Sequence, residues 1–138
     1  MRYVDASAVL RVLFVEPGTT VPIDDGAKLV SSKLLEVETF RAIDRARLLG
    51  LMGDAETAIK RKELSDLLSM LDLAPVDDVV IEGARSSFSV NVRALDALHV
   101  ATAEVLLREA EGESLEFWTH DERQATTALS RGLDVHGV

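Results

Sequence analysis

The chain has 138 residues, 47% of them hydrophobic, which suits a single folded domain over residues 1–138 and argues against intrinsic disorder. It contains no cysteine, which excludes disulfides, thiolate metal sites and cysteine nucleophiles. The formal net charge of −9 argues against the basic face by which most proteins bind nucleic acids nonspecifically, but it does not exclude a nuclease whose acids first bind a cation.

Strands and helices alternate along the chain. In order, we expect a strand over 2–5, a helix over 7–14, a loop rich in proline and glycine over 16–26, a strand over 28–31 and a helix over 32–49. There follow a helix over 54–71 capped by Asp54, a strand over 73–76, a helix from Asp77 or Asp78 to about 86, an irregular stretch over 87–93 and a buried helix over 95–107. A strand over 115–119, a helix over 122–131 and a strand over 133–136 complete the chain. This alternation predicts an α/β fold with a mostly parallel, twisted sheet and helices on both faces.

Three aspartates stand where a functional site is expected. Asp5 and Asp121 follow predicted strands, and ligands of parallel α/β folds bind beyond the carboxyl ends of the strands. Asp96 lies in a mostly apolar helix, where a carboxylate is costly unless a cation or hydrogen-bond donor meets it. Each of the three also suits a helix N-cap, so residue type alone leaves both interpretations open.

A fourth acid is expected from the helix over 32–49. At about 100° per residue, Glu38 lies on the interior side with Leu34, whereas Glu36 points away. An ion pair with Arg41 or Arg45 is an equal alternative for Glu38.

Other kinds of site find little support. The sequence has no Walker A loop, dinucleotide fingerprint or nucleophile elbow. His99 is interpreted as a core histidine, and Phe117 and Trp118 as core residues of a strand. A phosphoacceptor receiver domain is rejected because Asp5 has no acidic neighbour and no lysine follows Lys62.

Four segments together resemble a known family. They are Tyr-Val-Asp-Ala-Ser-Ala at 3–8, Ser32 followed by Glu38 and Arg41, Arg-Ala-Leu-Asp-Ala-Leu-His-Val-Ala-Thr-Ala at 93–103, and Thr-His-Asp-Glu-Arg at 119–123. In these residues and their order, the whole chain is similar to the PIN-domain ribonucleases, above all to the VapC toxins of bacterial toxin–antitoxin modules.

The resemblance implies a three-layer α/β/α sandwich and assigns roles to particular residues. Asp5, Glu38, Asp96 and Asp121 match the acidic quartet that binds Mg²⁺ or Mn²⁺ and carries out catalysis. Ser7 and Thr119 match the neighbouring hydroxyls that help hold metal or water. The family also implies an RNA substrate and an antitoxin whose basic segment occupies the acidic site.

We therefore expect a metal-dependent endoribonuclease that leaves a 5′-phosphate and a 3′-hydroxyl, with a non-cleaving PIN-like module for RNA or protein binding as the alternative. Arg41, Arg93 and the basic run over 60–62 are candidate phosphate contacts, although the run also suits an ordinary solvated helix face. We expect the protein to lie in the cytoplasm, because no signal peptide and no run of about 18–20 apolar residues is present. We also expect a homodimer.

Overall fold

A five-stranded parallel sheet forms the middle of the molecule, described here over residues 1–138 from a computed structural model. Its elements are, in order, β1 (Arg2–Val4), α1 (Ala6–Leu13), β2 (Leu29–Ser32), α2 (Leu34–Leu48), α3 (Asp54–Leu68), β3 (Asp72–Ala74), α4 (Asp78–Arg85), α5 (Ala94–Glu109), β4 (Glu116–Trp118), α6 (Glu122–Leu129) and β5 (Asp134–His136). The strands lie in the order β3-β2-β1-β4-β5, and every neighbouring pair is parallel.

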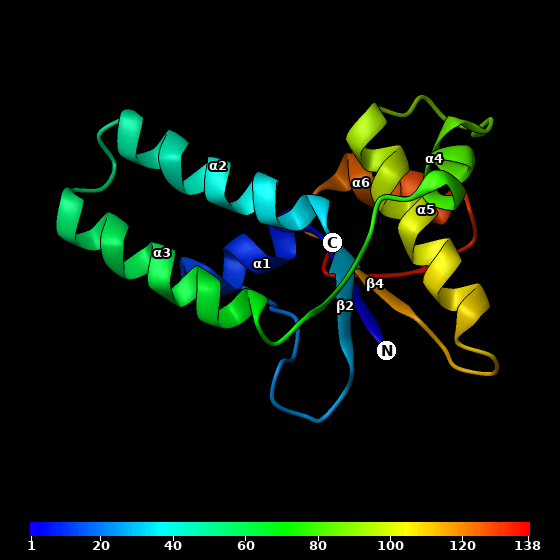
Figure 1. Cartoon of the computed structure of the whole chain (residues 1–138), viewed down its shortest axis with the longest axis horizontal. Coiled ribbons are helices and arrows are strands. Elements are labelled where there is room, and N and C mark those ends of the chain that lie inside the picture. The colour runs from blue at the N-terminus through cyan, green and yellow to red at the C-terminus, as the bar shows by residue number, and fades with distance from the viewer.

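Helices cover both faces of this sheet, as Figure 1 shows: α1, α2 and α3 lie on one side, and α4, α5 and α6 on the other. Because side chains alternate along a strand, neighbouring residues enter different cores. Val4 and Trp118 pack in the core under α1–α3, whereas Tyr3 and Phe117 pack in the core under α5 and α6. The three-layer α/β/α prediction is therefore confirmed.

The chain changes direction across the sheet between β1 and β4. From β1 it winds outward through β2 to β3, and it then returns through α4 and α5 to add β4 and β5 on the other side of β1. The loops after β1 and β4 consequently diverge at the carboxyl end of the sheet and leave a crevice, which is where such folds bind ligands. Asp5 follows β1, and Asp121 comes three residues after the end of β4.

All of the predicted strands and helices are present, with shifted ends. Gly53, not Asp54, is the N-cap of α3, whereas Asp77 caps α4 and its side chain accepts a hydrogen bond from the amide of Val80. The strand expected over 73–76 is β3, which begins one residue earlier and ends at Ala74.

None of the helices has the length and apolar character required to cross a bilayer.

An ion-pair network ties β1 to β4 through Arg2 and Glu116, the first residues of the two strands, at the end of the sheet opposite the crevice. The Arg2 Nε donates to Glu116 Oε2 at 2.8 Å, and the indole nitrogen of Trp118 donates to the same oxygen at 2.8 Å. The Trp118 hydrogen bond and then Arg2 hold the pKa of Glu116 below its ordinary value. A carboxyl whose pKa is lowered on folding stabilises the protein above its unfolded pKa, and this contribution is lost as the pH falls through the folded pKa.

We therefore predict that Glu116→Gln destabilises the protein by about 1 kcal/mol at neutral pH, a small effect because the carboxylate is partly exposed. The difference from the parent protein should shrink as the pH falls below the unfolded pKa of Glu116. Urea unfolding at neutral and acidic pH measures it, with exposed Glu113→Gln as a control that should change neither value. An equal deficit at both pH values would contradict this role of the charge.

Candidate active site

A pocket of about 320 Å³ lies at the carboxyl ends of β1 and β4. Its wall includes all four of the acids predicted from the sequence, together with two arginines and three other polar residues: Asp5, Glu38, Asp96, Asp121, Arg93, Arg123, Ser7, His99 and Gln124. Arg41 is not part of this wall, because its side chain is 70% exposed and pairs with Asp44 on the same helix. The carboxylates in the pocket outnumber the guanidinium groups by two.

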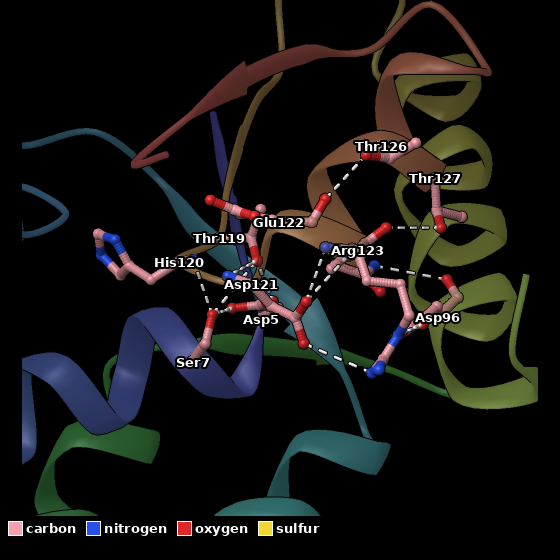
Figure 2. A network of polar contacts seen from close by, with 11 residues as sticks. Asp5, Ser7, Asp96, Thr119, His120, Asp121, Glu122, Arg123, Thr126 and Thr127 are labelled. Atoms are coloured by element: carbon pink, nitrogen blue, oxygen red, sulfur yellow. Dashed lines mark hydrogen bonds and ion pairs between the residues drawn. The ribbon is translucent and has the colours of Figure 1, made fainter.

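Asp5 is the most buried of the acids, only 5% exposed, and hydrogen-bond donors surround its carboxylate (Figure 2). Oδ1 accepts from the Ser7 hydroxyl at 2.7 Å and from the Ala8 amide at 2.9 Å, which makes Asp5 the N-cap of α1. Oδ2 accepts from the hydroxyl of Thr119, directly after β4. Burial raises the pKa of Asp5, and these hydrogen bonds oppose the rise by favouring the charged form.

The two hydroxyls also join the loops that follow β1 and β4. The Ser7 oxygen accepts a hydrogen bond from the amide of His120 at 2.7 Å, and the Thr119 oxygen accepts one from the amide of Asp121 at 3.1 Å. Ser7 and Thr119 are thus beside the acids, as the resemblance implies, and both hold Asp5. Their contact with a metal or water stays a prediction.

Asp96 and Asp121 share one cation. The Nε of Arg123 lies 2.8 Å from Asp96 Oδ2, and its Nη2 lies 3.5 Å from Asp121 Oδ2 (Figure 2). Asp121 is also the N-cap of α6, since its Oδ1 accepts from the amides of Arg123 and Gln124. The hydrogen bond to Asp96 raises the pKa of Arg123 above its ordinary value, so the guanidinium stays charged.

Glu38 has a histidine partner instead of a cation from its own helix. Its Oε1 lies 2.5 Å from Nε2 of His99, and Nδ1 of that ring lies 2.7 Å from the Tyr3 hydroxyl. Burial raises the pKa of Tyr3, so its hydroxyl keeps its proton beside the ring. The His99 ring therefore contacts the acid with one nitrogen and a buried hydroxyl with the other.

The structure decides between the alternatives that the sequence left open. Asp5 and Asp121 are both N-caps and pocket residues, so the two interpretations hold together for them. The N-cap interpretation of Asp96 is wrong: Arg93 occupies that position, and Asp96 is the third residue of α5. The ion pairs expected as an alternative for Glu38 are also wrong, because its carboxylate contacts His99 on α5.

The donor set of the pocket fits a hard divalent cation, which prefers carboxylate, carbonyl and hydroxyl oxygens. Gln124 also lines this pocket, and the buried carbonyl oxygen of its side chain has no hydrogen-bond partner in the protein. In the present arrangement no three acidic or histidine side chains converge closely enough to hold a metal. Each carboxylate is instead engaged by donors of its own chain, so three of them could ligate one ion only after some of these side chains move.

Three polar residues of the pocket, Gln124 among them, were not predicted from the sequence to have a functional role. Arg123 lies two positions after Asp121, and His99 lies three positions after Asp96 and thus on the same face of α5. His99 is buried, 2% exposed, as expected for a core histidine, yet its ring reaches the pocket. Helical spacing from the predicted acids was the signal that points to His99.

Comparisons with known proteins agree with this architecture. The PIN domain family model matches residues 2–129. Ribonuclease VapC47 of Mycobacterium tuberculosis (strain CDC 1551 / Oshkosh) is 32% identical over 130 residues, which cover 89% of this chain and 86% of that protein. Ribonuclease VapC46 of Mycobacterium tuberculosis (strain ATCC 25618 / H37Rv) is 31% identical over 137 residues, covering 96% and 94% of the two chains. With a family match over nearly its whole length and relatives of this identity and coverage, the chain belongs to the PIN-domain family and is VapC-like within it.

Proposed function

We propose that this protein is a metal-dependent endoribonuclease and the toxin of a toxin–antitoxin pair. The observation that carries the proposal is that four carboxylates from four separate segments meet in one pocket. This pocket lies at the switch point of the parallel sheet, between β1 and β4, where the chain changes direction. The names of the VapC relatives add that proteins similar along the whole chain are ribonucleases.

Asp5, Glu38, Asp96 and Asp121 would hold Mg²⁺ or Mn²⁺. When bound, such an ion supplies a hydroxide nucleophile near neutral pH and polarises the scissile phosphate. The protein fixes Asp5 through Ser7 and Thr119, and it fixes Glu38 through His99, so both carboxylates keep their positions before RNA arrives.

Arg93 would position the RNA backbone. It lines the pocket, is exposed and has no ion-pair partner, so its guanidinium is available to a phosphate. Arg41 and the basic run at Lys60–Lys62 lie outside the pocket wall, and contact by Arg41 would require RNA to extend along α2.

Water attacks phosphorus, the bond to the 3′ oxygen breaks, and the products carry a 5′-phosphate and a 3′-hydroxyl. Such a toxin would act on RNA in the cytoplasm.

We predict that Asp96→Asn lowers the rate of RNA cleavage by about 100-fold or more, because a charged oxygen ligand is lost from the pocket. The metal-free variant should unfold within about 1 kcal/mol of the parent, since the amide oxygen still accepts the hydrogen bond from Arg123 and the ion pair is partly exposed. Saturable stabilisation by Mn²⁺, followed by melting temperature, should shrink in the variant.

The matched control is Asp77→Asn, which removes an aspartate that caps α4 outside the pocket. Asparagine caps about as well as aspartate, so cleavage and metal response should be unchanged. Full activity of Asp96→Asn would refute the site assignment. A pure, folded parent protein that gives no chelator-sensitive cleavage would instead favour the alternative, a non-cleaving PIN-like module that binds RNA or protein.

The cognate antitoxin would insert a basic segment into the pocket. The contacts of Arg123 show that a guanidinium fits between Asp96 and Asp121, and the pocket has carboxylates in excess of its arginines. We predict that the product of a neighbouring gene forms a stable complex with this protein. Replacing one arginine of that product by alanine should weaken the complex at least about tenfold in titration calorimetry. No complex with either neighbour, or an antitoxin whose arginines are all dispensable, would contradict this mode of inhibition.

A homodimer would cover an apolar surface formed by α4 and α5. Ile81 is a large exposed hydrophobic residue there, and with Ala84, Ala94, Ala97 and Leu98 it lines an apolar groove of about 230 Å³ between the two helices. We predict that light scattering gives twice the chain mass of 15.0 kDa and that Ile81→Glu gives the single mass. A parent protein that remains monomeric at the concentrations used for folding studies would refute the dimer.

A further inference from the structure

The ion pair formed by Arg123 lies at the centre of the acidic pocket. Arg123 comes from the first turn of α6, and its side chain reaches back to Asp96 on α5 while also contacting Asp121 (Figure 2). Its side chain remains 44% exposed. Two other arginines, Arg61 and Arg131, are stacked on aromatic rings, whereas Arg123 has no such stacking contact to hold it in place.

A metal held by Asp96 and Asp121 would bind the same two carboxylates that this guanidinium contacts. Asp96 Oδ2 accepts the shorter of the two contacts from Arg123, and the side chain of Asp96 is only 11% exposed. A buried carboxylate needs a cation or donors, and Arg123 supplies that cation when no other is bound. A divalent ion that binds Asp96 and Asp121 therefore competes with Arg123 for their charge.

A displaced guanidinium keeps its charge, since arginine does not lose its proton in proteins, and so requires another anion. A phosphate is well suited, because the planar fork of arginine matches two phosphate oxygens. Arg93, on the same pocket wall, is already free of acidic partners, whereas Arg123 becomes free only when its acids are neutralised.

We propose that Arg123 is an exchangeable counter-ion of the pocket: it neutralises Asp96 and Asp121 in the metal-free protein and moves to an RNA phosphate when a divalent cation takes its place. This inference rests on the proposed metal-dependent nuclease function and adds a phosphate-binding residue to it. If Arg123 has this role, its substitution raises the affinity for a divalent ion and lowers the rate of RNA cleavage.

The test compares Arg123→Gln with the parent protein. Titration calorimetry with MnCl₂, without RNA, should show that affinity for the ion rises by about three- to tenfold, because the competing charge is gone. Cleavage of a random-sequence pool of single-stranded RNA at saturating Mn²⁺ should fall by about tenfold or more, because a phosphate contact is lost. Arg123→Lys, which keeps the charge but not the fork, should give a smaller rise in affinity, and it serves for the comparison if the glutamine variant does not fold.

Arg131→Gln is the matched control, because it breaks an arginine–carboxylate pair with Glu104 of α5 away from the pocket. It should leave both Mn²⁺ affinity and cleavage at saturating metal unchanged. Unchanged or weaker Mn²⁺ affinity in Arg123→Gln would overturn the counter-ion role, and unchanged cleavage at saturating metal would overturn the phosphate role. A parent protein that neither binds Mn²⁺ nor cleaves RNA would overturn the proposed function itself. If the parent protein does both, a negative result with Arg123→Gln overturns only the role of Arg123.

Discussion

The carboxylate of Asp5 accepts hydrogen bonds from both sides of the switch point: from Ser7 and Ala8 after β1, and from Thr119 after β4. These donors are neutral, so they favour the charged form of a buried acid without cancelling its charge. An arginine in their place would fix Asp5 as firmly, but it would also occupy the oxygens that a cation needs. The geometry of the pocket depends on this choice of hydroxyls and an amide.

The other acids are held in two different ways. Glu38 is held by the His99 imidazole, whose other nitrogen contacts the buried hydroxyl of Tyr3, whereas Asp96 and Asp121 share a guanidinium. Hydroxyls, a backbone amide and a histidine therefore hold Asp5 and Glu38, and an arginine holds Asp96 and Asp121. If a divalent ion enters, the second pair has to give up its guanidinium partner. The pocket is thus fixed on one side and adjustable on the other.

The fold and the identity of the acids were accessible from the sequence, because alternating strands and helices and polar residues after strands are local patterns. The partners of the acids were not accessible in this way. The contact of Glu38 with His99 joins residues 61 positions apart, and that of Asp96 with Arg123 joins residues 27 positions apart. Helical spacing placed Glu38 on the inner side of α2, but it allowed an ion pair with Arg41 or Arg45 of the same helix equally well. Aspartate is favoured at helix N-caps, so the sequence also allowed Asp96 to cap α5. The helix instead begins at Ala94, and Arg93 is its N-cap without a capping hydrogen bond from its side chain.

The winding of the sheet also bears on when the pocket comes into existence during synthesis. β4 pairs directly with β1, yet more than a hundred residues separate the two strands in the chain. A ribosome must therefore release almost the entire polypeptide before Thr119 can reach Asp5 and before Asp121 can take its place beside Asp96. Closure of so long a loop is slow and unfavourable until the rest of the core is in place. A growing or truncated chain consequently lacks the complete set of carboxylates, and a cell that makes this protein has the interval of translation in which to bring a binding partner to it.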